Sequence, residues 1–247
     1  ADEKLLTEIP EQIWIEKLLV EKDKSYHIWG KILESQELHD FWLPKGAIIK
    51  THKTEQVEID YSKYSHRPPL EHQKIAIEKL VGTKRFILAD DMGLGKTTST
   101  IIAALETGEQ KILIICPASL KINWEREIRN YTDRSVYISE GKNFSTEHDF
   151  VIVNYDILKN FYDVKNKDKS PITLANFGLV IIDEAHYIQN GQAQRTKLVN
   201  SFVKNVKRLW LLTGTPMTSR PMNYFNLLQL IDSPVAQNWM AYAIRYC

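Results

Sequence analysis

The sequence is poor in cysteine and contains no long apolar run. Only two cysteines, Cys116 and Cys247, occur in 247 residues, which leaves no basis for a disulfide framework or a cysteine-rich metal site. A reducing compartment is therefore the expected environment. No apolar run approaches the roughly 18 residues that a membrane-spanning helix needs, and no signal-peptide pattern opens the chain. We therefore expect an intracellular chain without a membrane partner.

The sequence also lacks an excess of charge of one sign. Its 32 Lys and Arg residues nearly balance 31 Asp and Glu residues, and the formal net charge is +1. A protein that binds nucleic acid through bulk electrostatics is strongly basic, so such binding here would need a local patch and backbone N–H donors. With 43% hydrophobic residues, the chain is long enough for one large core, or for a core and a small appendage.

Residues 89–97, Ala-Asp-Asp-Met-Gly-Leu-Gly-Lys-Thr, predict a phosphate-binding loop. Gly93 and Gly95 let the backbone curl so that successive N–H groups point at an anion, and the helix expected next adds its positive N-terminal end. Lys96 would reach the β- and γ-phosphates, and Thr97 would place a hydroxyl on a magnesium ion. The segment therefore predicts a nucleoside triphosphate and a divalent metal. A purely structural glycine turn is the alternative.

A second motif follows the apolar run of residues 177–182. This run predicts a buried strand that delivers Asp183 and Glu184 to its C-terminal end, where open α/β sheets bind ligands. Asp183 is suited to hold the magnesium, directly or through water, and Glu184 to orient or deprotonate the water that attacks the γ-phosphate. An acidic pair after a strand is often only a solvated turn, but behind a phosphate-binding loop the catalytic interpretation is favoured.

Apolar strand candidates alternate with helical segments along the chain. This alternation predicts an α/β fold, with a parallel sheet and helices on both faces. Right-handed crossovers would collect Lys96, Asp183 and Thr213 in one cleft at the C-terminal edge of the sheet. The expected strands are residues 86–89, 112–116, 135–138, 150–153, 179–182 and 208–212, and helices are expected at residues 98–106 and 222–231.

Four segments, in order, resemble the motifs of the superfamily-two helicases and translocases, and within them those of the Swi/Snf-like double-stranded DNA translocases. Residues 90–97 look like the family's first motif, whose aspartates explain why Asp90 stands where the phosphate-binding loop usually has its first glycine. The resemblance runs from about Leu70 to the C-terminus. The other segments are Leu-Glu-His-Gln at 70–73, similar to the adenine-reading motif, Asp-Glu-Ala-His at 183–186, similar to the second motif, and Leu-Thr-Gly-Thr-Pro at 212–216, similar to the third.

The resemblance implies a single RecA-like lobe that binds ATP and Mg²⁺. By this resemblance Gln73 would pair with the adenine edge through its amide, whereas a glutamine on a helix surface is the alternative. The residues implied to bind ATP are Gln73, Asp91, Met92, Gly93, Leu94, Gly95, Lys96, Thr97 and Thr98. Those implied in catalysis are Lys96, Asp183 and Glu184, and those implied as magnesium ligands are Thr97 and Asp183. Those implied to couple the nucleotide site to movement are His186, Thr213, Gly214 and Thr215.

A further segment resembles the family's strand-then-helix motif that grips one DNA strand. It follows the second expected strand with Pro117, Ala118 and Ser119 and continues through Trp124. Ser119 is a good N-cap, and the free N–H groups of the helix start would bind a backbone phosphate. Pro117, Ala118 and Ser119 are therefore candidate DNA contacts.

The fourth expected strand ends in Asn154 and Tyr155, which look like the next nucleic-acid motif. These residue types also commonly do no more than satisfy a turn. The lysine-rich stretch of residues 163–173 predicts an exposed loop, which either is simply solvated or touches DNA phosphates.

The first 62 residues lie outside the resemblance and predict a small accessory element, with the ATP-binding lobe expected at residues 63–247. Residues 13–15 and 26–29 have the β-branched and aromatic content typical of strands, while residues 5–20 also fit a helix. The tryptophans of this segment are expected to anchor a core rather than stack on bases.

Residues 217–221 depart from the continuation usual in eukaryotic chromatin remodellers and are more similar to the annealing-helicase and bacterial or phage branches. The sequence holds no candidate for the family's second RecA-like lobe, which supplies arginine fingers. We therefore expect a fragment of a longer protein that alone hydrolyses ATP poorly, since an arginine finger contributes about a thousandfold or more in rate.

Together these features predict the first, ATP-binding lobe of an ATP-dependent double-stranded DNA translocase, with duplex DNA and the second lobe as partners. A strand-separating DNA or RNA helicase, the motor of a restriction system and a non-enzymatic nucleotide switch are the alternatives. The expected location is the cytoplasm or nucleoid for a bacterial or phage source and the nucleus for a eukaryotic one.

Overall fold

The computed structural model describes residues 17–20, 26–29, 48–49, 57–214, 221–233, 236 and 238–246. The chain divides into two compact units, Ala1–Lys53 and Thr54–Cys247. The first unit contains a three-stranded sheet. In it, β1 (Lys17–Val20) pairs antiparallel with β2 (Tyr26–Trp29), and β2 pairs parallel with β3 (Ile48–Ile49).

The strands of the first unit decide part of what the sequence left open. The strand expected at residues 26–29 is present as β2. The helix alternative for residues 5–20 is wrong for its last four residues, because β1 is extended and pairs with β2 along its whole length. The strand expected at residues 13–15 lies outside the described residues.

The division between the units comes earlier than the boundary after residue 62 that the sequence suggested. The reason lies in the short helix η3 (Tyr61–Tyr64), whose tyrosines bond to the second unit. The Tyr61 hydroxyl donates to the carbonyl of Lys74 over 3.3 Å, and the buried Tyr64 hydroxyl donates to the Glu106 carboxylate. This short segment is therefore part of the larger unit.

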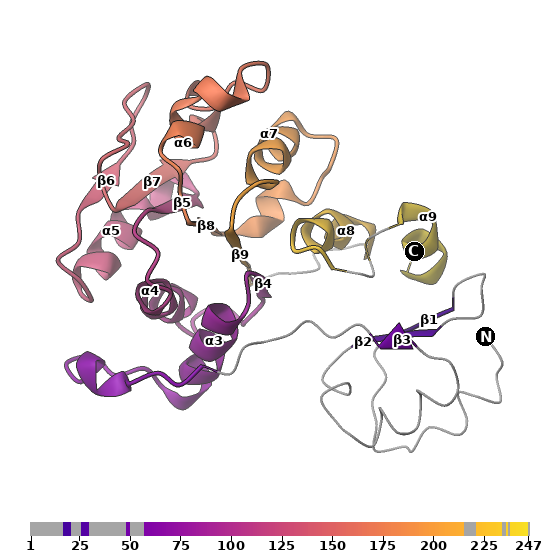
Figure 1. Ribbon diagram of the computed structural model, residues 1–247, viewed down its shortest axis with the longest axis horizontal. Helices are drawn as coiled ribbons and strands as arrows, with labels where there is room; N and C mark the ends of the chain where they lie inside the picture. Colours follow the sequence, from indigo (N-terminus) through magenta and orange to yellow (C-terminus); the bar gives the residue numbers. More distant parts are fainter. Residues whose placement is uncertain are drawn as a thin grey trace. The chain divides into compact units, whose positions relative to one another are not determined.

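A six-stranded sheet forms the centre of the second unit, and every strand pairing in it is parallel. All six strands expected from the sequence are present, in the spatial order β4-β9-β8-β5-β7-β6 (Figure 1). Their bounds are β4 Arg85–Leu88, β5 Ile112–Cys116, β6 Val136–Ile138, β7 Phe150–Asn154, β8 Leu179–Ile182 and β9 Arg208–Leu212.

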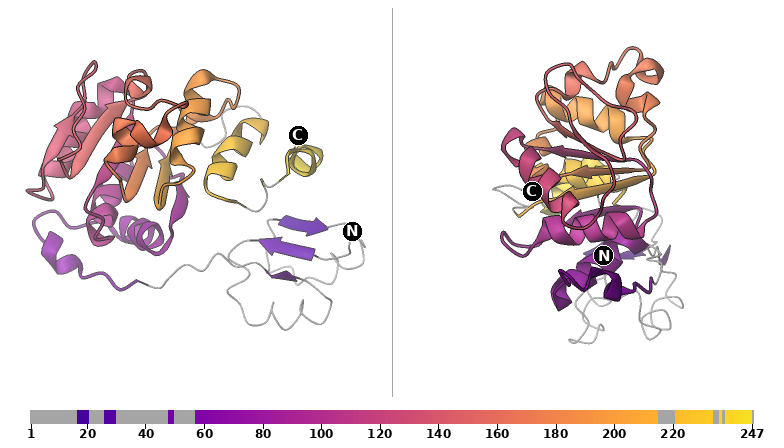
Figure 2. Two further views of the ribbon diagram at one scale, coloured as in Figure 1. Left: turned by 45° about the horizontal axis from the view of Figure 1, so that its top comes forward. Right: turned by 90° about the vertical axis from the view of Figure 1, so that its left-hand side faces the viewer.

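Helices cover both faces of this sheet, as Figures 1 and 2 show. On one face lie α3 (Glu71–Gly82), α4 (Lys96–Glu106) and α5 (Lys121–Arg129), and on the other lie α6 (Pro171–Leu174), α7 (Gln194–Val203) and α8 (Pro221–Leu230). Strand β5 shows how the sequence builds two cores. Ile112 and Ile114 enter the cluster with the first set of helices, and Leu113 and Ile115 enter the cluster with the second. A strand buried on both faces needs such a continuous apolar run.

The remaining elements are short or lie late in the chain. Helices expected at residues 98–106 and 222–231 are present as α4 and α8, and α9 (Trp239–Tyr246) follows. The short 3-10 helices are η4 Ala118–Leu120, η5 Leu158–Asn160, η6 Lys167–Lys169 and η7 Ala185–Ile188. Within the described ranges, no helix is long and apolar enough to cross a bilayer.

The strand order determines where a site can form. Strands β8 and β9 lie between β4 and β5, and because all of them run in the same direction, the loops that follow β4, β8 and β9 meet at one edge of the sheet. The amide N of Thr213, just after β9, donates to the carbonyl of Leu88 at the end of β4 over 3.1 Å. The phosphate-binding loop, the acidic pair and the third motif are therefore neighbours.

Candidate nucleotide site

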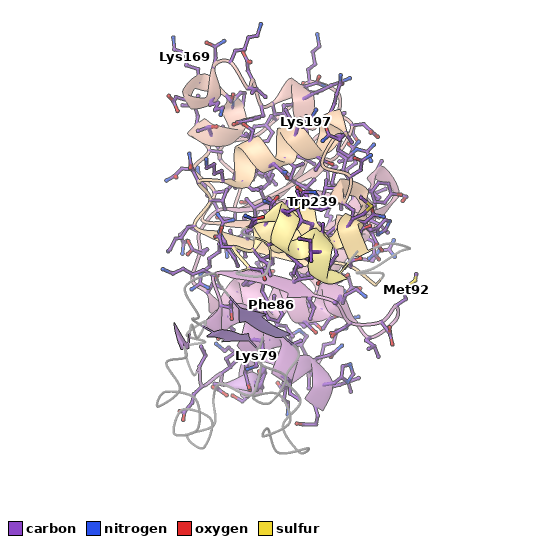
Figure 3. All side chains as sticks on the ribbon, turned by 90° about the vertical axis from the view of Figure 1, so that its right-hand side faces the viewer. Lys79, Phe86, Met92, Lys169, Lys197 and Trp239 are labelled. Carbon is purple, nitrogen blue, oxygen red and sulfur yellow. The ribbon has the colours of Figure 1, made fainter. Side chains whose placement is uncertain are left out.

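The loop between β4 and α4 has the backbone that its glycines allow. Gly93 and Gly95 have φ angles of +85° and +77°, in the left-handed region that residues with a Cβ rarely adopt. A Cβ at Gly95 would also overlap Nε2 of Gln73. The backbone conformation therefore favours glycine at the cap of α4, and a Cβ there would also displace the Gln73 amide. Met92, in the same loop, is 77% exposed and stands at the edge of the lobe in Figure 3.

Lys96 is the first residue of α4, and its ammonium is held inside the loop. Nζ donates to the carbonyl of Asp90 over 2.7 Å and to that of Asp91 over 3.0 Å. The turn after β9 closes on the same place, because a Cβ at Gly214 would lie 2.8 Å from Cγ of Met92 and 3.5 Å from Nζ of Lys96. The structure thus brings the first and third motifs into contact around one positive charge.

Gln73 is buried beside this loop, with 8% of the residue exposed. Its Oε1 accepts the amide N–H of Leu70 over 2.9 Å, and its Nε2 donates to the carbonyl of Leu94 over 3.2 Å. The His72 ring also lies 3.1 Å from that carbonyl through Nε2. The surface alternative for Gln73 is therefore wrong, because its amide joins α3 to the loop. Its pairing with adenine stays a prediction.

Asp183 follows β8 and is 8% exposed. Its Oδ2 accepts the indole N–H of Trp124 over 2.8 Å, and its Oδ1 accepts the backbone N–H of Glu184 over 2.9 Å. Burial raises the pKa of Asp183 above its ordinary value, the hydrogen bond from Trp124 opposes this shift, and the Glu184 carboxylate adds to it. Lys96 also lowers this pKa, so its charge lies within electrostatic reach of Asp183.

Glu184 takes an unusual backbone conformation, with φ +52° and ψ +51°. A non-glycine residue in this region marks local strain, which is common at functional sites. Its Oε2 lies 3.1 Å from Nδ1 of His186, an ion-pair distance without the alignment of a hydrogen bond. The Tyr155 hydroxyl donates to the main-chain oxygen of Asp183 over 2.6 Å. The acidic turn, Asp183–His186, is therefore fixed by contacts from Trp124 and Tyr155 as well as by contacts within the turn.

The oxygen ligands around the loop fit magnesium. Asp183 contributes a carboxylate, and Thr97, half-buried on the first turn of α4, contributes a hydroxyl. Among the residues that the structure describes, no cluster of three or more His, Cys, Asp or Glu side chains forms a metal cage. Magnesium is commonly held by one or two carboxylates together with substrate phosphates, so this donor set suits an ion that arrives with a triphosphate.

The candidate DNA residues after β5 lie at the surface. Ala118 and Ser119 are exposed and Pro117 is half-buried. The expectation that Ser119 caps the next helix is wrong, because η4 intervenes and α5 begins only after Leu120, which makes no side-chain cap bond.

The candidate residues after β7 lie in the interior instead. Asn154 and Tyr155 are 7% and 5% exposed, and the Tyr155 hydroxyl is engaged by Asp183. Of the residues expected to couple nucleotide to movement, His186, Thr213 and Gly214 adjoin the acidic turn or the loop, and Thr215 lies outside the described residues.

The family of the chain is decided by a match to the SNF2-related domain, which covers residues 72–245. The chain belongs to the SNF2-related family. The match spans the phosphate-binding loop, the acidic turn and α9, so the family resemblance expected from the motifs is confirmed.

SNF2-related relatives of known name share about a third of the aligned residues. The Caenorhabditis elegans protein named SWI/SNF-related matrix-associated actin-dependent regulator of chromatin subfamily A-like protein 1 homolog is 32% identical over 171 residues, which is 66% of this chain and 24% of that protein. The human protein named DNA annealing helicase and endonuclease ZRANB3 is 31% identical over 176 residues, 66% of this chain and 16% of that protein. The chain thus spans less than a quarter of the length of these relatives.

The SNF2-related fold is also found among solved structures. The Sulfolobus solfataricus SWI2/SNF2 ATPase core in complex with dsDNA superposes with a TM-score of 0.61 at 24% sequence identity, over 77% of this chain and 40% of that chain. This likeness confirms the expected RecA-like α/β fold.

Sequence reasoning gave no role to Trp124 in this SNF2-related site. The available signal was its place four residues before Ile128 on an amphipathic helix, which marks a buried face. Such a pattern predicts burial but cannot name Asp183 as the partner of the indole.

Proposed function

We propose that this chain is the ATP-binding first lobe of an ATP-dependent double-stranded DNA translocase. The observation that carries the proposal is the placement of Lys96, Asp183 and the turn at Gly214 at one edge of the sheet, in a chain of the SNF2-related family. A P-loop lysine, an acidic pair after a buried strand and a third motif touching the loop are the parts that ATP hydrolysis coupled to movement requires.

Each group around the proposed nucleotide site would have a separate role. Backbone N–H groups of residues 91–95 and the start of α4 would cradle the phosphates, with Lys96 exchanging its contacts to the carbonyls of Asp90 and Asp91 for phosphate oxygens. Thr97 and Asp183 would hold Mg²⁺, which supplies neutralisation of the charge that develops on the transferred phosphoryl group. Glu184 would orient or deprotonate the attacking water.

Two features support the recognition of adenine and the link to movement. The Gln73 amide already donates to the carbonyl of Leu94 in the phosphate-binding loop. Adenine pairing at this amide would therefore change a contact of the loop directly. His186 faces Glu184, and Gly214 lies against Met92 and Lys96. A change at the γ-phosphate would therefore alter contacts of both the second and the third motif.

Duplex DNA and a second RecA-like lobe are the proposed partners. The related solved core is described in complex with dsDNA, and relatives carry the name DNA annealing helicase. Exposed Ala118 and Ser119 offer a surface for a DNA phosphate. The second lobe would supply arginine fingers, without which hydrolysis by this chain is expected to be lower by about 10³-fold or more. A location alongside cellular DNA, inside the cell, follows from this function.

The test is steady-state ATP hydrolysis by the full-length protein, alone and with duplex DNA, single-stranded DNA or RNA at one salt concentration. Strong stimulation by duplex DNA is expected. Lys96→Ala should abolish the stimulated rate, whereas replacement of the exposed Lys197 on α7 (Figure 3) by alanine should preserve it. A preference for RNA or single strands would contradict the duplex assignment, and turnover retained in the Lys96 variant would contradict the site.

A further inference from the structure

A single side-chain hydrogen bond joins helix α5 to the acidic pair. Trp124 lies in α5, is 1% exposed, and donates its indole Nε1–H to Oδ2 of Asp183 over 2.8 Å. The indole has one polar group, and that group can only donate. The one hydrogen-bonding group of the Trp124 side chain is therefore directed at the carboxylate that the proposed function assigns to magnesium.

The other contacts of Asp183 act on different atoms. Oδ1 accepts the backbone N–H of the adjacent Glu184, the main-chain oxygen accepts the Tyr155 hydroxyl, and the amide N donates to the carbonyl of Ile115 over 2.8 Å. Of these contacts, the one from Trp124 alone links the carboxylate to a separate element of the fold. Hydrogen bonds to an ionised carboxylate are short and directional, so the indole fixes the direction in which the second lone pair of Oδ2 points.

Helix α5 also belongs to the candidate DNA segment. It follows directly from η4, which carries exposed Ala118 and Ser119. The Lys121 ammonium, at the start of α5, donates to the carbonyl of Ser139 over 3.0 Å, which ties this helix to the segment after β6. The η4–α5 segment is thus continuous from an exposed surface to the buried carboxylate.

We propose that Trp124 is a positioning residue that holds Asp183 in its magnesium-binding orientation and connects that orientation to the η4–α5 segment. This inference rests on the proposed function of the acidic pair. A DNA phosphate bound at Ala118 and Ser119 would shift α5, which carries the Trp124 indole. DNA binding would therefore change the hydrogen bond that orients the Asp183 carboxylate. Partners of this kind behind a metal ligand typically contribute about 10–100-fold in metal affinity.

A matched pair of substitutions separates this role from simple core packing. Trp124→Phe keeps an aromatic ring in the core but removes the N–H donor. Trp210, on β9, is also fully buried in the same hydrophobic cluster, and its Nε1 donates over 3.4 Å to the main-chain carbonyl of Thr83, away from the acidic pair. Trp210→Phe therefore reproduces the loss of volume without touching Asp183.

The first measurement is binding of a fluorescent, non-hydrolysable ATP analogue to the 247-residue chain while Mg²⁺ is titrated. We expect Trp124→Phe to need about 10–100-fold more Mg²⁺ for half-maximal binding, with Trp210→Phe and the wild type alike. Equal Mg²⁺ requirements in the two variants would overturn the inference while leaving the proposed function intact. A wild-type chain that binds no nucleotide would instead overturn the proposed function, and the inference with it.

A second measurement needs no variant, so it stands even where Trp124→Phe fails to fold. In the ¹⁵N-labelled wild-type chain, the Trp124 indole N–H resonance, assigned from its through-space contacts, should move when Mg²⁺ is added to the nucleotide-bound chain. The Trp210 resonance should stay in place. A Trp124 resonance that ignores the metal overturns the inference.

The connection to DNA has its own readout in the full-length protein. Duplex DNA should lower the Mg²⁺ requirement for nucleotide binding in the wild type and in Trp210→Phe, and should have little effect in Trp124→Phe. An equal decrease in all three proteins would overturn the link between η4–α5 and Asp183.

Discussion

Replacing Arg85 should destabilise the lobe far more than replacing an exposed arginine. Arg85 begins β4, and its guanidinium reaches the C-terminal ends of α7 and α8. Nη1 donates to the carbonyl of Leu230 over 2.7 Å, and Nη2 lies within 3.2 Å of the carbonyls of Val203, Lys204 and Val206. Carbonyls at a helix C-terminus lack partners within the helix and carry partial negative charge. Arg85→Met would leave them without this donor.

The magnitude follows from the hydrogen bonds lost. One full bond from each of the two nitrogens gives two charged hydrogen bonds, each contributing about 1.5–3 kcal/mol. The ion pair between Arg85 and Asp232, at 3.1 Å, adds little because the Asp232 side chain is 74% exposed. We therefore expect Arg85→Met to lower the free energy of unfolding by about 3 kcal/mol or more. At about 2–4 °C per kcal/mol, the Tm should fall by about 6–12 °C.

Urea and thermal unfolding of the 247-residue chain, followed by circular dichroism, measure this effect. Arg129→Met is the control, because Arg129 pairs at 2.8 Å with Glu125 on the same helix and its side chain is 58% exposed. That change should cost no more than about 0.5 kcal/mol. Arg85→Lys keeps the charge but not the planar fork, so an intermediate value is expected. Free energies for the two methionine variants within about 1 kcal/mol of each other would refute the reasoning.

Three further substitutions test the site itself. Gly95→Ala should weaken nucleotide binding about tenfold, since a Cβ at φ +77° costs about 1–2 kcal/mol and would overlap Gln73. Fluorescence anisotropy with a labelled ATP analogue measures this affinity. An unchanged affinity would contradict the proposal that residues 91–95 bind the phosphates. Glu184→Gln should keep nucleotide affinity while lowering the DNA-stimulated kcat of the full-length protein about 10²-fold or more. Phosphate release measures this kcat. An unaltered kcat would show that Glu184 has no catalytic role. For Asp183, burial raises the pKa above 3.8, so the folded chain binds this proton more tightly than the unfolded chain. In the absence of Mg²⁺, the contribution of Asp183 to stability should therefore fall as pH rises above about 4. The stability of the wild type should fall more steeply with pH, or rise less, than that of Asp183→Asn, and equal slopes in urea unfolding would contradict this.

The six-stranded sheet could be predicted because each strand coincides with a short apolar run in the sequence. Strand β5 is the clearest case: Ile112–Cys116 is fully buried on both faces, and no other element type suits so short a run between two helices. The lysine-rich stretch was also predictable as exposed, since residues 163–169 are exposed. It is not a plain loop, however, because η6 and the start of α6 lie within it. Its far end turns inward, where Ser170 and Ile172 are buried.

The side-chain partners within the site could not be predicted, because they depend on how distant segments meet. Trp124 and Asp183 are 59 positions apart, and neither position carries a signal for the other. Ser119 has the residue type of a helix cap, but the backbone first makes a 3-10 turn, so the cap falls elsewhere. Tyr155 has the residue type of a surface contact, yet the end of β7 points it into the core.

The strand order has a consequence for how the protein comes into being. Strands β4 and β5 are successive in the chain but are separated in the sheet by β8 and β9, which are made last. During synthesis the phosphate-binding loop is therefore present long before its acidic partner and the Gly214 turn that closes on it. Contacts between such distant segments slow folding, so on the proposed function the site would be complete only once β8 and β9 have entered the sheet. A nascent chain that ends before β8 has the phosphate-binding loop without Asp183, Glu184 and the Gly214 turn. Under the proposed function, the topology would therefore keep an unfinished lobe from hydrolysing ATP.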